Sequence, residues 1–182
     1  MDMIDEFIFV PWGNSYYEIE SCPSTATYSH PARICWNLAC NATSHANNDP
    51  NCFQGKQICQ FGEPDCYANR LEACALKHYN PTQSLSFINC YEGLNVPSNK
   101  AAVSCARQAN MNVTLLQDCS SGVEGKTLDS SNARLTAMIP GGHAITPYPI
   151  LNGVVLNRNA SLLEAICTAY NAGTGVTPPA CK

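Results

Sequence analysis

With 182 residues, the chain is long enough to bury one sizeable core, and we expect a single domain over residues 1–182. Its 45% hydrophobic and 13% charged residues are typical of a globular protein and exclude an intrinsically disordered one. The formal net charge is −4 and the Lys and Arg residues are scattered singly, so we expect no nucleic-acid partner. No apolar stretch is long enough to predict a membrane span.

Cysteine is the outlier of the composition, with twelve residues. The cytosol would keep such a set reduced, so this even number indicates a disulfide framework in an oxidising compartment. Zinc is the alternative, but zinc ligands usually come in pairs two to four residues apart, and only Cys35 and Cys40 lie so close. We therefore expect disulfides and neither a metal nor a cofactor. The cysteines are Cys22, Cys35, Cys40, Cys52, Cys59, Cys66, Cys74, Cys90, Cys105, Cys119, Cys167 and Cys181.

Three glycosylation sequons agree with that compartment and predict N-glycosylation at Asn41, Asn112 and Asn159. We therefore expect a glycoprotein that is secreted or lysosomal. The first residues do not form a signal peptide, because residues 1–6 are acidic and the apolar run after them covers only residues 7–10. Accordingly, we expect either a mature or partial chain, or a true start upstream of the first methionine.

The first predicted element is that apolar run, Phe7–Val10, which indicates a buried strand ended by Pro11. Residues 14–58 are rich in Ser, Asn, Pro, Thr and Cys and show no sustained period. We expect a long loop there, with at most a turn or two of helix, and its cysteines are the reason that it can be ordered.

Residues 63–138 have the pattern of a helical region. Pro64 suits the first turn of a helix that ends at Asn80-Pro81, a second helix covers residues 82–92, and Ser98 caps a third. Two further helical segments are predicted over residues 115–119 and 125–138.

Residues 146–171 have a different sequence pattern, which predicts a hairpin and a last helix. The hairpin turns at Asn152-Gly153, a pair that favours tight turns between antiparallel strands. The helix covers residues 161–170, and its inner face is expected to consist of Leu162, Leu163, Ile166 and Ala169.

The most specific local pattern is Cys59-Gln60-Phe61-Gly62-Glu63-Pro64-Asp65-Cys66, followed by Asn69, Glu72 and Cys74. It resembles the signature of the gamma-interferon-inducible lysosomal thiol reductase family, Cys-Gln-His-Gly-x-x-x-Cys-x-x-Asn-x-x-Glu-x-Cys, with Phe61 in place of the histidine. Other landmarks follow in the family's order: Val10-Pro11-Trp12-Gly13-Asn14, Ile88-Asn89-Cys90-Tyr91-Glu92, Cys119-Ser120-Ser121-Gly122, and His143 through Asn152-Gly153. The resemblance covers about residues 7–14 and 57–182, whereas residues 15–56, apart from a segment at residues 16–25, resemble nothing in the family.

The resemblance implies a fold class. It is α/β, a disulfide-rich thioredoxin-like fold with a helical insertion, in which residues 15–56 form a cysteine-rich inserted loop. In this fold a proline before the hairpin is usually cis and faces the reactive disulfide, and Pro147 occupies that place. The alternative is that Pro147 simply begins a strand.

One part of the family's pattern is missing. The family places a first strand and a Cys-x-x-Cys before its Val-Pro-Tyr-Gly-Asn strand, whereas this sequence starts at that second strand and contains no Cys-x-x-Cys. Thiol–disulfide exchange needs an attacking thiolate and usually a resolving thiol, so we expect the reactive pair to lie outside these residues. A missing strand would leave its neighbours with unpaired edges, and we expect a second polypeptide or a strand from residues 15–56 to complete the sheet.

A substitute for the reactive pair is Cys22. Residues 16–25 resemble the family's active-site segment, Tyr-Tyr-Glu-Ser-Leu-Cys-Pro-x-Cys, but Thr25 stands where the second cysteine should be. Cys22 is therefore a catalytic candidate. A structural disulfide is the interpretation we favour, because Pro31 argues against a following helix and eleven other cysteines offer partners.

Two functions follow from these residues. The first is a thiol–disulfide oxidoreductase that acts on protein disulfides in an acidic compartment, with its reactive pair elsewhere. The second is a non-enzymatic, disulfide-stapled binding or structural protein. The family landmarks favour the first, and the inserted loop favours the second. An unrelated secreted scaffold is a third hypothesis, against which the order of the landmarks argues.

Overall fold

The computed structural model describes residues 4, 6–41, 49–94, 98–139, 142–143, 145–157 and 159–182. Their contacts separate the chain into two compact units. The larger is Val10–Gly142, and the smaller joins the residues up to Phe9 to His143–Lys182. A single domain over residues 1–182 therefore stays a prediction. No helix in the described parts of the chain is both long enough and apolar enough to cross a membrane.

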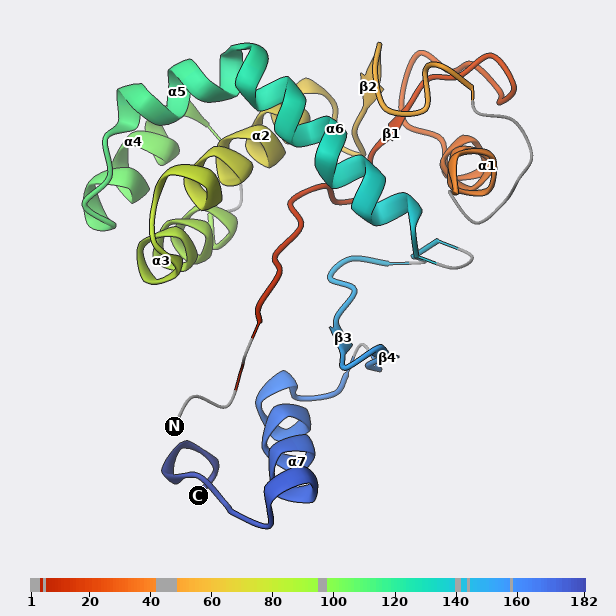
Figure 1. Cartoon of the computed structure of the whole chain (residues 1–182). Coiled ribbons are helices and arrows are strands. Elements are labelled where there is room, and N and C mark those ends of the chain that lie inside the picture. The colour runs from red at the N-terminus through yellow and green to blue at the C-terminus, as the bar shows by residue number, and fades with distance from the viewer. Residues whose placement is uncertain are drawn as a thin grey trace. The chain divides into compact units, whose positions relative to one another are not determined.

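Helix α2 (Glu63–His78) is the centre of the larger unit (Figure 1). It contacts α3 (Pro81–Glu92), α5 (Val113–Ser121) and α6 (Val123–Ala137), while α4 (Asn99–Gln108) packs against α3 and α5. Apolar side chains from α2 to α5 meet in one buried cluster, whose largest fully buried side chains are Leu71, Phe87, Tyr91 and Leu116. These five helices confirm the predicted helical region.

Local signals explain where these helices begin. Pro64 lies in the first turn of α2, where a missing N–H costs nothing. The Ser98 side chain accepts a hydrogen bond from the Ala101 N–H and caps α4, as predicted. Asn112 caps α5 in the same way, which makes that helix longer than the single turn predicted over residues 115–119.

The other end of the larger unit holds α1 (His30–Cys40) and a two-stranded antiparallel sheet of β1 (Tyr16–Tyr17) and β2 (Gln57–Ile58) (Figure 1). Here the sequence prediction was wrong, because α1 has three turns where we expected a loop. Pro31 falls in the first turn, a position that needs no backbone donor, and Ser29 caps the helix. The buried side chains of α1 then recur at helical spacing: Ala32, Arg33, Trp36, Asn37 and Cys40.

A second buried cluster lies under α1. It contains Trp12, Trp36 and Ile58, together with Ala133 and Ala137 from α6. The Trp36 Nε1–H donates to the Cys52 carbonyl at 2.9 Å, so a buried polar group of this cluster has a partner. Helix α6 thus joins both parts of the larger unit, since it contacts α2 at one end and α1 at the other.

The predicted strand at Phe7–Val10 is absent. These residues have no regular structure, and Ile8 is 62% exposed. An apolar run forms a strand only when another strand accepts its hydrogen bonds, and no described segment pairs with this one.

The smaller unit contains the predicted hairpin, β3 (Ile150–Leu151) and β4 (Val154–Val155). Asn152 and Gly153 both have positive φ, as an Asn-Gly turn requires. Helix α7 (Leu162–Thr174) and a 3-10 turn, η1 (Pro179–Cys181), follow. The expected inner face of α7 is wrong, because none of its residues is buried and Leu163 is 55% exposed.

Candidate functional site

All twelve cysteines form disulfides, which confirms the central expectation from composition. One of these disulfides joins Cys167 to Cys181, fourteen residues apart near the end of the chain. The shortest separation is seven residues, between Cys59 and Cys66, so none of the six bonds joins a Cys-x-x-Cys. The pairs are Cys22–Cys35, Cys40–Cys52, Cys59–Cys66, Cys74–Cys119, Cys90–Cys105 and Cys167–Cys181.

The disulfides differ in how well they are shielded. Both cysteines are buried in three of them, Cys40–Cys52, Cys59–Cys66 and Cys74–Cys119. Both cysteines are partly exposed in Cys22–Cys35 and in Cys167–Cys181. Exchange requires a thiolate to reach a sulfur, so these last two are the accessible ones.

Cys22 lies in a turn, where its N–H donates to the Ile19 carbonyl, and its partner Cys35 lies in the middle of α1. A helix lowers the pKa of a cysteine within its first turn, and Cys35 is five residues past the first residue of α1. This pair therefore lacks the placement that activates a cysteine in this way. A catalytic role for Cys22 stays a prediction.

The signature residues of α2 hold this helix to the start of the larger unit. The Asn69 side chain donates to the Trp12 carbonyl at 3.1 Å and to Ser15 Oγ at 3.3 Å. Ser15 Oγ in turn contacts Cys59 Sγ at 3.1 Å, next to the Cys59–Cys66 bond. Phe61, which stands where the family has histidine, is 79% exposed at the tip of the loop that this bond closes.

The signature residue Glu72 is 3% exposed on α2. Burial, together with its hydrogen bond to Glu92, raises the pKa of Glu72 well above its usual range. Burial also raises the pKa of the neighbouring Asp65. A protonated Glu72 can donate to the Glu92 carboxylate and so link α2 to α3, which makes its role one of helix packing.

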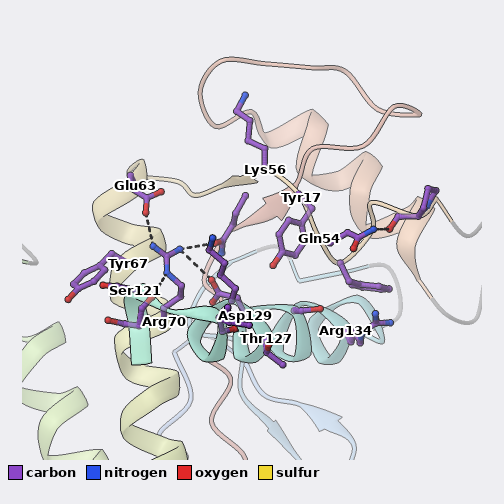
Figure 2. A pocket seen from close by; sticks show the side chains of 18 residues that line it. Tyr17, Gln54, Lys56, Glu63, Tyr67, Arg70, Ser121, Thr127, Asp129 and Arg134 are labelled. Atoms are coloured by element: carbon purple, nitrogen blue, oxygen red, sulfur yellow. Dashed lines mark hydrogen bonds and ion pairs between the residues drawn. The ribbon is translucent and has the colours of Figure 1, made fainter. Parts of the chain in front are cut away.

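A second set of polar residues lines an open groove between β1–β2, α2 and α6 (Figure 2). At its floor, Arg70 makes ion pairs with Glu63 at 2.6 Å and with Asp129 at 3.6 Å. Its guanidinium also donates to the Ser120 carbonyl at 3.0 Å and to the Gln57 side chain at 3.4 Å. Arg70 is thereby fixed from four directions.

Asp129 is 2% exposed on α6. Burial raises the pKa of Asp129 to about 7, although the Arg70 guanidinium opposes this change. Burial also raises the pKa of Tyr17 to about 12, and the nearby Asp129 carboxylate adds to the effect. The floor of the groove therefore holds a carboxyl that titrates near neutral pH.

The sequence analysis missed Arg70 and Asp129. The signal for Asp129 was its position on the small, buried stripe of α6, four residues after Gly125 and four before Ala133. A carboxylate on a buried helix face needs a cation, and Arg70 on α2 is the cation that reaches it.

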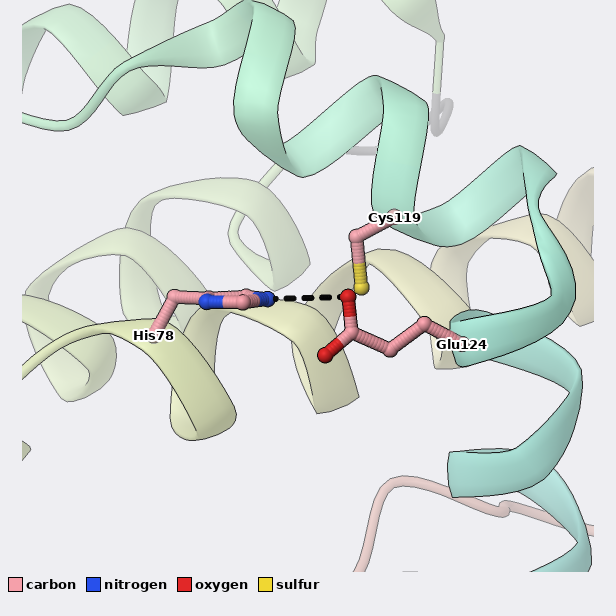
Figure 3. Close-up of side chains that lie close together, drawn as sticks. All are labelled: His78, Cys119 and Glu124. Carbon is pink, nitrogen blue, oxygen red and sulfur yellow. Dashed lines mark hydrogen bonds and ion pairs between the residues drawn. The ribbon is translucent and has the colours of Figure 1, made fainter.

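The structure also brings His78, Cys119 and Glu124 together, with ligand atoms within 4.8 Å of one another (Figure 3). His78 Nε2 lies 3.1 Å from Glu124 Oε2. Cys119, however, is bonded to Cys74, and a metal ligand must be a thiolate. The arrangement is an exposed His–Glu contact over a buried disulfide, and it offers no metal site while that bond is intact.

The remaining predicted residues are placed as follows. The Thr146–Pro147 peptide bond is cis, and whether Pro147 faces a reactive disulfide stays a prediction. Asn112 and Asn159 are exposed, as glycan acceptors need to be. Asn41 is partly buried at the end of α1, and residues 42–43 of its sequon lie outside the described residues.

Comparison with known proteins identifies the family. The sequence model of the gamma interferon inducible lysosomal thiol reductase family matches residues 30–109. The chain belongs to this family. The match begins in α1, so it corrects the expectation that residues 15–56 resemble nothing in the family.

Three curated relatives agree with the family model. The gamma-interferon-responsive lysosomal thiol protein of Arabidopsis thaliana is 32% identical over 129 residues, which is 68% of this chain and 53% of the relative. Gamma-interferon-inducible lysosomal thiol reductases match at 27% identity in Mus musculus, over 62% of this chain and 46% of the relative, and at 32% in Carassius auratus, over 68% and 50%. The chain thus spans about half the length of the relatives it matches.

The structure and the family together establish a mixed α/β, disulfide-rich protein of a thiol reductase family. Its helices, two small sheets and six disulfides are consistent with that family. The thioredoxin-like arrangement stays a prediction.

Proposed function

We propose that this chain is the disulfide-stapled body of a thiol–disulfide oxidoreductase of the secretory or lysosomal pathway, and that its reactive dithiol is not among its own six disulfides. The observation that carries the proposal is the state of the cysteines. All are paired, none of the pairs is a Cys-x-x-Cys, and three pairs are buried. Family membership supports the redox chemistry, and the disulfide content supports an oxidising compartment.

The proposal includes a second polypeptide segment that completes the sheet and carries the dithiol. Apolar side chains exposed on the smaller unit support this part. Ile8 and its neighbours, which have no regular structure, and Val154 on β4 present their side chains to solvent. An apolar segment without a strand partner, or the outer edge of a two-stranded hairpin, can bind another strand readily.

A non-enzymatic role is the second candidate. The specific observation in its favour is the same complete pairing, since a chain without a free thiol cannot attack a substrate disulfide. In that case the stapled fold would serve as a binding or structural module.

The experiment is a redox titration of the purified, oxidised chain. Dithiol buffers are set over the range from about −350 to −120 mV, the thiols are alkylated, and each cysteine is read by mass spectrometry. Reactive pairs of oxidoreductases titrate between about −270 and −120 mV, whereas structural disulfides resist reduction above about −300 mV. We expect all six bonds to behave as structural. Reduction of Cys22–Cys35 at a potential typical of oxidoreductases would overturn the proposal.

An activity assay separates the two candidates. Reduction of a labelled protein disulfide is measured at acidic pH for the chain alone, for Cys22→Ser with Cys35→Ser, and for the matched pair Cys167→Ser with Cys181→Ser. We expect no activity in any of these, and activity only when the chain is purified together with a polypeptide that carries Cys-x-x-Cys. Inactivity of that complex favours the non-enzymatic module. Activity of the chain alone that is lost only in the first pair of substitutions assigns the reaction to Cys22.

A further inference from the structure

We propose that the groove between β1–β2, α2 and α6 is a binding site for an extended, acidic peptide segment of another protein (Figure 2). The proposal does not depend on the redox chemistry. It concerns a surface on which none of the cysteines lies.

The length of the groove fits a short extended peptide. One wall is a single face of α6, whose exposed and partly exposed residues Val123, Lys126, Thr127, Ser130 and Arg134 recur at helical spacing. At about 1.5 Å per residue this face is roughly 17 Å long, which matches about five residues of a strand. The opposite wall includes Phe53 and Lys56.

Charge selects the class of peptide. The groove is lined by four of the ten Lys and Arg residues of the chain, Lys56, Arg70, Lys126 and Arg134, but by only two of its fourteen acidic residues. A local excess of positive charge therefore occurs in a chain whose net charge is −4. Such a concave, cationic surface attracts carboxylates.

The cations are also held in place. Arg134 lies over the Phe53 ring, with its guanidinium carbon 4.2 Å from the ring centroid, and Lys56 Nζ lies 3.2 Å from Glu18 Oε2. Cation–π stacking keeps the Arg134 charge at the wall and leaves its edge able to donate hydrogen bonds. A ligand that binds there orders fewer side chains, which lowers the entropic cost of binding.

The same residues argue against a polyanion. Glu63 and Asp129 lie at the floor beside Arg70, so a nucleic acid or sulfated glycan, with a charge at every unit, would place negative groups against them. A peptide can place carboxylates opposite Lys126 and Arg134 and uncharged groups over the floor. Its main chain can bond to neutral polar residues of the lining such as Gln54 and Ser121.

Fluorescence anisotropy tests the proposal on the oxidised chain. The probe is a labelled octapeptide with four Asp or Glu residues alternating with Ser and Tyr, and its Asn/Gln counterpart is the neutral control. The double variant Lys126→Gln, Arg134→Gln removes two charges from the groove. The matched control, Lys100→Gln with Arg107→Gln, removes two exposed charges from α4, outside the groove.

We expect the acidic octapeptide to bind and the neutral one not to bind. The groove variant should weaken binding about tenfold, since two ion pairs to the peptide are lost, whereas the α4 variant should change it less than about twofold. Equally weakened peptide binding in both variants would show that binding depends only on the net charge of the protein, and it would overturn the proposal. Tighter binding of heparin or of a single-stranded oligonucleotide, lost in the same groove variant, would assign the groove to a polyanion and also overturn it.

Discussion

The substitution Asp129→Asn tests the electrostatics at the floor of the groove. Asp129 is 2% exposed and faces Arg70 and Glu63 on α2, Tyr17 on β1 and Gln57 on β2. Asparagine has nearly the same shape and cannot ionise, so the variant keeps the packing and removes the titration. We expect it to make the free energy of unfolding less dependent on pH.

The magnitude follows from the pKa of Asp129, which burial raises from 3.8 to about 7. Between these two values the folded protein holds a proton that the unfolded chain has released. The stability from this group is therefore fully present below about pH 4 and is lost as pH rises toward 7. One pH unit within that window is worth about 1.4 kcal/mol, so from pH 5 to 8 the wild-type protein should lose about 2 to 3 kcal/mol more than the variant.

The assay is urea unfolding at pH 5 and pH 8 with the disulfides intact, followed by tryptophan fluorescence. The chain has two tryptophans, Trp12 and Trp36, and both are buried in the cluster that includes Ala133 of α6. Asp118→Asn on α5 is the control, because it removes an exposed carboxylate from the same unit. Glu72 also has a raised pKa, but it is present in every protein of the series and cancels from the comparison.

The result that would refute this reasoning is an equal loss of stability from pH 5 to 8 in wild type and Asp129→Asn. That outcome would mean that the carboxyl is ionised in the folded protein at both pH values and that Arg70 outweighs burial. A loss in the Asp118→Asn control that differs from wild type would show that the pH dependence arises from net charge instead.

Three other changes have defined outcomes. Arg70→Met removes the cation from a buried carboxylate and should lower the free energy of unfolding by about 3 kcal/mol at pH 8 but much less at pH 5, in the same urea titration. Replacing both Cys74 and Cys119 by Ser opens a loop of 45 residues and should cost about 4 kcal/mol by the chain-entropy relation, measured by thermal unfolding. Asn112→Ala should remove both a predicted glycan and the cap of α5, with a cost of about 1 kcal/mol, whereas Thr114→Ala should remove only the glycan. Mass spectrometry and the melting temperature of the protein expressed in eukaryotic cells separate the two effects.

The helices of residues 63–137 could be predicted because their ends carry local signals. Pro64 and Ser98 occupy first-turn and cap positions, and such positions are recognisable without any tertiary contact. The hairpin at Asn152-Gly153 was predictable for the same reason, since both residues must adopt positive φ. Where local and tertiary requirements agree, sequence reasoning succeeds.

The residues that precede helix α2 show where prediction from the sequence fails. Pro31 was interpreted as evidence against a helix, but proline is compatible with a first turn and Ser29 caps the helix in front of it. The run Phe7–Val10 failed in the opposite way, because strand propensity without a pairing partner leaves the backbone unbonded. The bond between Cys22 and Cys35 could not be predicted either, since the pairing of twelve cysteines cannot be deduced from their spacing.

The candidate groove could not be predicted because its parts come from distant segments. Tyr17 and Lys56 lie before the family signature, Arg70 follows Asn69 within it, and Arg134 lies far beyond it. Only Asp129 carried a local sign, as an acidic residue on a buried helix face, and its partner becomes visible only when α2 and α6 pack together.

The titration of Asp129 also predicts how peptide binding should respond to pH. As pH falls from 7.5 to 5.5, this carboxyl gains a proton, so the floor of the groove loses a negative charge. Peptide carboxylates with ordinary pKa values near 4 remain mostly ionised over this range. The acidic octapeptide should therefore bind more tightly at pH 5.5 than at pH 7.5 in the wild-type protein, whereas Asp129→Asn should bind with nearly the same affinity at both. An unchanged affinity in wild type, measured by the same anisotropy titration, would contradict this prediction. It would mean that the proton on Asp129 stabilises the fold but does not change the electrostatic potential that the bound peptide experiences.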